Sequence, residues 1–189
     1  MPLRVTDAGG FAYPLQIAEA LIFAGDHRVR VANISYVMSV EPITALAAQW
    51  FQEQCGGVVT IAAGNFSWWI EPAPDNPYVL TVTATANAQH FLAPFTSTGN
   101  NVDIAAPGMN IWTTTGTAFY TQTQGTSCSC AFVAGCAAIL VTMRPDLTGP
   151  QLQTAVQQGA TDQGPLGWDS GYGYGVLNVM GAVTVAAGM

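Results

Sequence analysis

Short apolar segments alternate with longer segments of helical periodicity, and this alternation constrains the fold most. Residues 58–63 (VVTIAA) form a continuous run rich in β-branched side chains, as expected for a parallel strand covered on both faces. Further strands are predicted at 29–34, 78–84 and 102–106. Helices are predicted over 15–25, 42–55, 127–143 and 148–158, and in the tail 164–188. The first helix is expected to stop at Gly25 and the second at Gly56. This order predicts an α/β layer structure.

Composition excludes several classes of protein. Of the 189 residues, 50% are hydrophobic and only 8% are charged, so the chain can bury enough surface to fold. The length predicts a single domain over residues 1–189. The net charge is -7, and the four basic residues are all arginines: Arg4, Arg28, Arg30 and Arg144. Without a basic stripe, we expect no binding to nucleic acid or to an anionic membrane.

Membrane and targeting signals are weak. The longest uncharged apolar run extends only from residue 130 to residue 143, short of the roughly 20 residues that span a bilayer. The start, MPLRVTDAGG, has no apolar stretch typical of a signal peptide. We therefore expect a signal that was removed, a signal that lies upstream, or a cytosolic protein.

The four cysteines match no metal-binding CxxC pattern. They are Cys55, Cys128, Cys130 and Cys136. Three of them fall on one predicted helix, where the geometry for pairing is poor. We expect buried free thiols, with a disulfide or redox role as the alternative.

Residues 125–135 (GTSCSCAFVAG) place Ser127 at the start of a helix made of small residues. Such a helix can pass close to its neighbours, and its N-terminus presents free N–H groups suited to a developing oxyanion. The alternative is that Ser127 only caps a core helix, as most serines at such positions do.

Residues 58–65 (VVTIAAGN) end in Gly64 and Asn65. A carboxamide at the C-terminal end of a parallel strand lies where ligands bind in open α/β sheets. Its N–H group can donate to charge that develops on a bound carbonyl. The alternative for Asn65 is an ordinary turn residue.

Together these two segments resemble the subtilisin-like serine proteases (subtilases, peptidase family S8). GTSCSCAFVAG is similar to the family signature GTS-x-[SA]-x-P-x-VAG around the nucleophile, and VVTIAAGN to the strand that leads to the oxyanion-hole asparagine. The similarity continues in order through residues 29–35, 76–84, 95–108, 142–156 and 171–183. The resemblance implies the C-terminal two-thirds of a catalytic domain. Its fold would be a three-layer, doubly wound, mostly parallel α/β sheet that lacks the family's N-terminal strands.

The resemblance implies roles for matching positions. Ser127 would be the nucleophile, and Asn65 would bind the oxyanion together with the Ser127 N–H. The pocket for the residue before the cleaved bond would be flanked by Ser35, Tyr36, Val37, Ala62, Ala63 and Gly64. Gly125 and Thr126 would line the same cleft.

The chain departs from the family at the rest of the triad. The family order is Asp, His, Ser, and residues 3–10 (LRVTDAGG) resemble the segment that follows the histidine helix. The only histidines, His27 and His90, are expected in solvated loops, and Asp7 in a loop on the rim of the cleft. The Asp and His are therefore expected outside this chain, which would be nearly inert alone.

Other departures concern the cleft and the surface. Phe132 and Ala131 replace a common histidine and proline, and Val37 stands where glycine is common. A β-branched side chain at position 37 is expected to crowd the strand that pairs with substrate. An unpaired sheet edge and exposed apolar surface are also expected.

Three interpretations remain open. The chain is part of a serine endopeptidase whose Asp and His lie upstream, a non-catalytic peptide-binding or structural relative, or a subunit completed by a separate chain. The expected partner is a polypeptide substrate. No cofactor is certain; the resemblance leaves a structural calcium ion open. Secretion is expected from the family.

Overall fold

The computed structural model describes residues 1–37, 41–67, 69–86, 90–116 and 118–189. Its helices are α1 (Pro14–Asp26), α2 (Pro42–Cys55), α3 (Thr126–Met143), α4 (Gly149–Gln158) and α5 (Val179–Ala187). The strands of its main sheet are β1 (Val31–Ile34), β2 (Val58–Ala62), β4 (Leu80–Thr85) and β6 (Ile104–Pro107). Two small sheets are formed by β3 (Ile70–Glu71) with β5 (Thr98–Gly99), and by β7 (Ile111–Thr115) with β8 (Phe119–Thr123).

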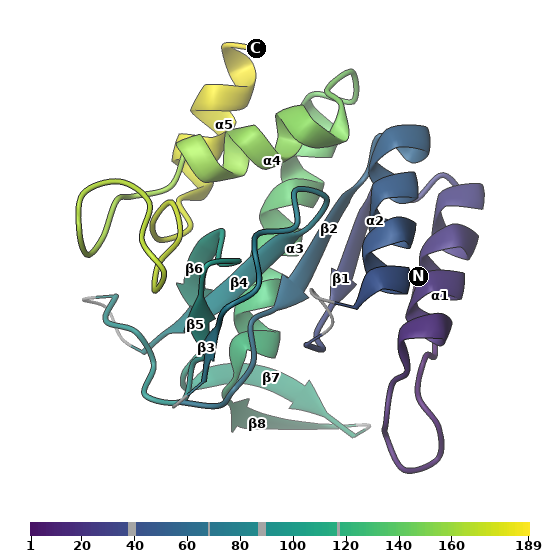
Figure 1. Ribbon diagram of the computed structural model, residues 1–189, viewed down its shortest axis with the longest axis horizontal. Helices are drawn as coiled ribbons and strands as arrows, with labels where there is room; N and C mark the ends of the chain where they lie inside the picture. The colour runs from purple at the N-terminus through teal and green to yellow at the C-terminus, as the bar shows by residue number, and fades with distance from the viewer. Residues whose placement is uncertain (38–40, 68, 87–89, 117) are drawn as a thin grey trace.

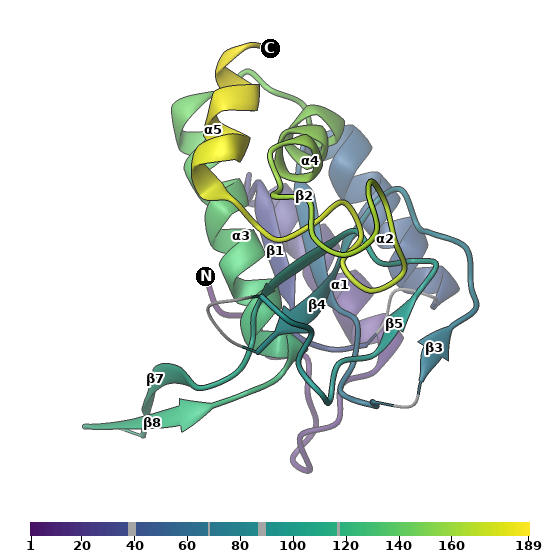
Figure 2. The same cartoon turned by 90° about the vertical axis from the view of Figure 1, so that its left-hand side faces the viewer.

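The main sheet has four parallel strands in the order β1-β2-β4-β6. Helices α1 and α2 cover one face, and α3 lies against the other face, with α4 and α5 above α3 towards one end of the sheet (Figures 1 and 2). This arrangement confirms the predicted three-layer α/β fold.

Alternate residues of β2 enter two separate cores. Val59 and Ile61 pack with α1 and α2 around the fully buried Phe51, whereas Val58 and Ala62 pack with α3, α4 and α5. Because both faces of the strand are buried, its sequence is a continuous apolar run instead of an alternating one.

The predicted stop at Gly25 is wrong, because α1 continues to Asp26. A Cβ atom on Gly25 would lie 2.5 Å from the Cys55 Sγ and 2.6 Å from the Trp50 ring of α2. The glycine therefore allows two helices to pack closely and does not end one. The stop at Gly56 is confirmed, since this residue adopts a left-handed conformation with φ of 62°.

Helix α3 is apolar on nearly all sides. It is long and apolar enough to cross a membrane by length and composition, a test that buried core helices also pass, and 44% of it is buried. Leu140 and Cys136 face the core, while Phe132, Ile139 and Met143 are exposed. All four cysteines are free, with Cys130 and Cys136 buried and the other two half-buried.

Candidate active site

The first turn of α3 lies across the C-terminal ends of the main-sheet strands. The Gly125 N–H donates to the Gly108 carbonyl just after β6 (2.8 Å), and the Ser129 hydroxyl donates to the Ala106 carbonyl within β6 (2.9 Å). The Thr126 N–H donates to Asn65 Oδ1 just after β2 (2.9 Å). The fold thus brings Asn65 and Ser127 to one edge of the sheet, where α/β proteins bind ligands.

Hydrogen bonds fix the orientation of the Asn65 carboxamide. The Gly64 N–H donates to Thr126 Oγ1 (3.2 Å), so the Thr126 hydroxyl proton is left to donate to Asn65 Oδ1 (3.1 Å). The same Oδ1 accepts the Thr126 N–H. With Oδ1 engaged twice, Asn65 Nδ2 is the donor that remains for a ligand.

Gly125 leaves a space beside this donor. A Cβ atom on Gly125 would lie 3.2 Å from Asn65 Nδ2 and 3.7 Å from the backbone nitrogen of Ser127. Its φ of +144° is also strained for any residue with a side chain. A position beside Gly125 therefore lies near both the Asn65 Nδ2 and the Ser127 backbone nitrogen.

The Ser127 hydroxyl is engaged with the strand end after β1. It donates to the Ser35 carbonyl (3.2 Å), and the Ser35 hydroxyl donates in return to the Ser127 carbonyl (3.1 Å). Within the described residues, the Ser127 hydroxyl forms no hydrogen bond with a carboxylate or an imidazole.

The residues predicted to flank the substrate pocket lie together at the ends of β1 and β2. Ala62 and Ala63 are buried, and the Gly64 N–H is held by Thr126. The Val37 side chain lies 3.2 Å from the position that a Cβ on Gly64 would take. Tyr36 and Val37 are exposed. The Val37 side chain thus lies close to Gly64, and the crowding of a substrate strand by Val37 stays a prediction.

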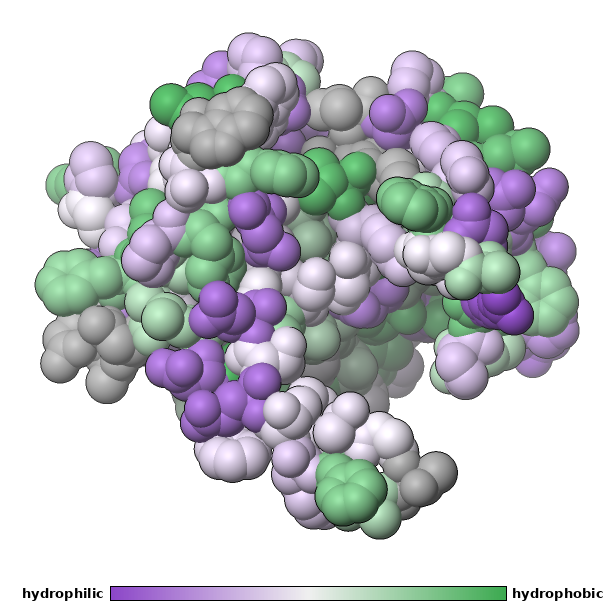
Figure 3. All heavy atoms as spheres, turned by 90° about the horizontal axis from the view of Figure 1, so that it is seen from below, coloured by the Kyte–Doolittle hydropathy of each residue, from purple (hydrophilic) through white to green (hydrophobic). Residues whose placement is uncertain are grey.

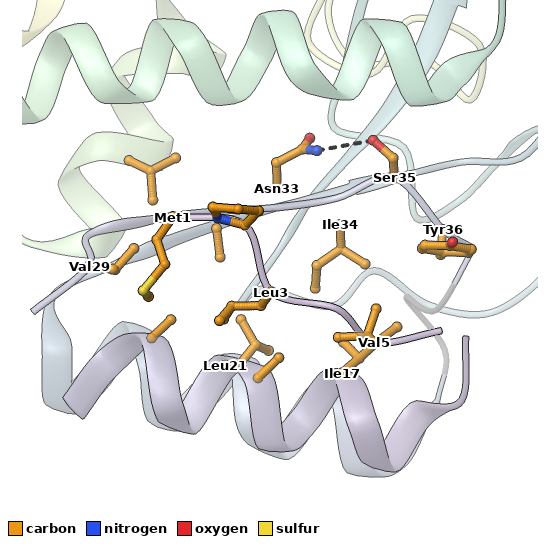
Figure 4. Close-up of a pocket in the computed structure, with 15 residues that line it drawn as sticks. Met1, Leu3, Val5, Ile17, Leu21, Val29, Asn33, Ile34, Ser35 and Tyr36 are labelled. Atoms are coloured by element: carbon orange, nitrogen blue, oxygen red, sulfur yellow. Dashed lines mark hydrogen bonds between the residues drawn. The ribbon is translucent and has the colours of Figure 1, made fainter. Parts of the chain in front are cut away.

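An apolar groove of about 490 Å³ runs along the outer edge of β1 towards Ser35 and Tyr36. Figure 4 shows Leu3 and Val5 on one side of it, residues of α1 below, and the hydrogen bond between Asn33 and Ser35 at its rim. Among the described residues, β1 pairs only with β2, so its outer edge has no strand partner there.

A second hollow of about 370 Å³ adjoins Ser127 on the side of the β7–β8 hairpin. It is lined by Ile111, Trp112, Thr113, Thr123, Ser127, Cys128, Ala131 and Phe132. No residue between 104 and 143 is charged or a histidine. The hairpin projects from the body at the lower edge of Figure 3, and this side of Ser127 is therefore open and uncharged.

The predicted loop positions of the histidines are partly correct. His27 caps the C-terminus of α1, is exposed and stacks on Phe23, at the end of the sheet opposite to Ser127. His90 is half-buried, and its Nδ1 is a buried atom that lacks a hydrogen bond within the described residues, so it is not a freely solvated side chain. Asp7 accepts the N–H groups of Gly9 and Phe11 and acts as a turn residue.

The described part of the chain contains no group of three or more His, Cys, Asp or Glu side chains that could hold a metal. Burial raises the pKa of the Cys130 thiol to about 12, so this cysteine is a neutral hydrogen-bond donor and not a thiolate ligand. Structural calcium stays a prediction from the resemblance.

Comparison with known proteins identifies the family. The profile of the Subtilase family matches residues 1–175, and the chain belongs to this family. It is 29% identical to Subtilisin Savinase of Lederbergia lenta over 181 residues, which cover 95% of this chain and 66% of the relative. It is 32% identical over 186 residues to the Thermophilic serine proteinase of Bacillus sp. (strain AK1), with 97% and 45% coverage.

The fold agrees with this assignment. The solved structure of Sphericase matches with a TM-score of 0.82 at 24% identity, over 93% of this chain and 66% of that one. The chain therefore spans two thirds or less of the length of these relatives.

Proposed function

We propose that this chain contributes the nucleophile and the oxyanion hole of a serine endopeptidase. Ser127 attacks the peptide carbonyl, and the oxyanion is stabilised by Asn65 Nδ2 and the Ser127 N–H. The observation that carries this proposal is the space beside Gly125, which lies within reach of both donors. Substrate is a polypeptide that enters between the ends of β1 and β2, and secretion follows from the family.

The attack requires a base, because the Ser127 hydroxyl must lose its proton to become an effective nucleophile. In the described residues this proton goes to the Ser35 carbonyl, which cannot remove it. We infer that the Asp and His of the triad come from another segment of the same protein or, as the second option, from a separate chain. On either route, the hollow of about 370 Å³ that is lined by Ser127 offers the His an approach to the Ser127 hydroxyl.

A non-catalytic peptide-binding domain is the second candidate. The observation that favours it is Val37, whose side chain lies against Gly64 at the entrance to the substrate pocket. This candidate retains polypeptide binding and predicts no turnover under any condition.

The experiment compares hydrolysis of a fluorogenic peptide by two forms of the chain. One is the 189-residue chain alone. The other is the same chain fused to the N-terminal segment of a subtilase relative that carries the Asp and His. We expect turnover only for the fusion, and we expect Ser127→Ala to lower its kcat by about 10⁶, the size of the effect in subtilisin itself.

A fusion that folds and binds peptide without turnover would support the non-catalytic candidate. Turnover that survives Ser127→Ala would place the nucleophile elsewhere and contradict the proposal.

A further inference from the structure

Hydrogen bonds connect the Ser127 carbonyl to the buried face of the sheet, and the donor of each of the first two can be worked out in turn. A carbonyl can only accept, so the Ser35 hydroxyl must donate its single proton to the Ser127 oxygen (3.1 Å). Ser35 Oγ is then an acceptor for its other neighbour, Asn33 Nδ2 (3.0 Å). The amide of Asn33 is thereby fixed, with Nδ2 towards Ser35.

The next links lead from the exposed Asn33 into the core. The Thr60 hydroxyl lies 3.4 Å from Asn33 Oδ1 and 3.4 Å from the Cys130 carbonyl, so its single proton is shared between these two acceptors. Asn33 and Thr60 are paired residues in the register of β1 and β2. Thr60 Oγ1 is in turn the nearer acceptor for the thiol proton of Cys130 (3.2 Å), and the Ile34 carbonyl is the second (3.7 Å). Thr60 and Cys130 are fully buried. Burial also keeps the thiol protonated and therefore a donor.

The resulting series begins and ends within the first two turns of α3. It runs from Cys130 through Thr60, Asn33 and Ser35 to Ser127, which lies one helical turn before Cys130. The N-cap residue of this helix, Gly125, has no side chain that could cap the helix. The series thus ties the start of α3 to β1 and β2 through side chains.

We propose that Asn33, held by Thr60, is a positioning residue for Ser127. The role rests on the proposed function of Ser127 as the nucleophile. By fixing the Ser35 hydroxyl on the Ser127 carbonyl, Asn33 holds the backbone of Ser127 independently of its side chain. The Ser127 hydroxyl can then turn from the Ser35 carbonyl to a base while its Cα stays in place, which is the precision that a nucleophile needs.

The test replaces the nucleophile by a thiol whose pKa reports its surroundings. The background carries Ser127→Cys together with Cys55→Ser and Cys128→Ser, which leaves the buried Cys130 and Cys136. The rate of alkylation by iodoacetamide, measured against pH, gives the pKa of the introduced thiol. Residues 104–143, which include α3 and the β7–β8 hairpin, contain no Asp, Glu, His, Lys or Arg, so their titratable side chains in this background are Tyr120, Cys130, Cys136 and the introduced thiol. Tyr36 is the titratable side chain that follows Ser35.

Asn33→Leu removes the donor at an exposed position, where a change of similar size is tolerated. Without Asn33, the Ser35 hydroxyl is no longer held on the Ser127 carbonyl, so the backbone at residue 127 can shift relative to the Ser35 carbonyl and lengthen the hydrogen bond from the neutral thiol to that carbonyl. We therefore expect the pKa of the introduced thiol to fall and its alkylation at neutral pH to rise about threefold or more. Thr60→Val should act in the same direction and Thr60→Ser should restore the original value.

The matched control is Thr81→Val, because the Thr81 hydroxyl is also buried in a strand but has no hydrogen-bond partner within the described residues. It should leave the pKa of the introduced thiol unchanged. An unchanged pKa in Asn33→Leu, or an equal shift in Thr81→Val, would overturn the proposal.

If the variant with the introduced thiol fails to fold, a second measurement tests the proposal without it. In the chain with Ser127 intact, the amide resonance of Ser127 should move in Asn33→Leu and stay in Thr81→Val; no movement in Asn33→Leu contradicts the proposal. Neither readout needs proteolysis, so a failure of peptide hydrolysis would remove the nucleophile role and leave the positioning result standing.

Discussion

The two sides of Ser127 are built differently. On the side of β1 and β2, backbone and side-chain groups of Ser35, Gly64, Asn65 and Thr126 satisfy one another in a nearly continuous hydrogen-bonded arrangement. On the side of the hairpin, the surface is open, uncharged and apolar. The difference teaches that this chain holds Ser127 and the Asn65 carboxamide with its own residues, while no carboxylate or imidazole in the part of the chain that the structure describes is bonded to the Ser127 hydroxyl.

The largest effect that would sharpen this comparison is expected at Asn65. Asn65→Ala in the catalytically complete protease should lower kcat by about 10²–10³ with little change in KM, because Nδ2 acts on the charge of the transition state. The size is the one known for the asparagine of subtilisin. Steady-state kinetics on a peptide substrate measures both constants. If Asn65→Ala left kcat unchanged, the residues on the side of β1 and β2 would not form the oxyanion hole.

Thr126→Val tests the hydrogen bond between the Gly64 N–H and the Thr126 hydroxyl. The variant keeps the shape of the side chain but leaves the buried Gly64 N–H without its acceptor. We expect a loss of about 1–3 kcal/mol in the free energy of unfolding, measured by urea titration. Thr44→Val is the control, since the buried Thr44 hydroxyl lacks a partner within the described residues. Equal losses in the two variants would show that the hydrogen bonds around Gly64 contribute nothing specific.

Asp103 extends the comparison to a buried polar group away from Ser127. Burial, and the charge of Asp75, raise the pKa of its carboxyl, although the Thr81 N–H and Gln157 donate to it. Since the folded pKa exceeds the unfolded value of about 4, this group's contribution is complete below that pH and is lost as pH rises through the folded pKa.

The unfolding temperature should therefore fall with rising pH above about 4 more steeply in the unmodified chain than in Asp103→Asn. Thermal unfolding at a series of pH values measures the two slopes. Parallel curves would show that Asp103 titrates alike in the folded and unfolded states.

The smallest effect is expected on the open side. Trp112 and Phe119 are 68% and 71% exposed, so Trp112→Ser and Phe119→Ser should change the free energy of unfolding by less than about 0.5 kcal/mol. Sedimentation velocity should show less self-association, because exposed apolar surface is removed. A loss of about 2 kcal/mol or more would mean that the hairpin is packed in solution and would break the comparison.

Much of the fold could be predicted from local pattern. The buried run of β2 and the glycine after α2 have signals that do not depend on distant residues, and both predictions are confirmed. The β7–β8 hairpin was missed because it buries neither face, so its sequence lacks the alternation that marks a half-buried strand. Gly25 was misread because its role depends on Trp50 of another helix.

The candidate site was only partly predictable for the same reason. Ser127 and Asn65 stand out through their segments, but Asn33 and Thr60 become partners only through the register of two strands. A polar residue in a short strand carries no local mark of such a contact. The resemblance to the family likewise gave no indication of the link from Cys130.

The central claim is that Ser127 is a nucleophile held in position by this chain, and that its general base comes from outside the described residues. Labelling of the purified 189-residue chain with a fluorophosphonate probe, read by intact mass beside a Ser127→Ala control, tests it most directly. We predict no stoichiometric labelling of the chain alone, and labelling at Ser127 once an Asp- and His-bearing segment is supplied. Stoichiometric labelling of the chain alone that disappears in the control would contradict the claim, because the base would then lie within these residues.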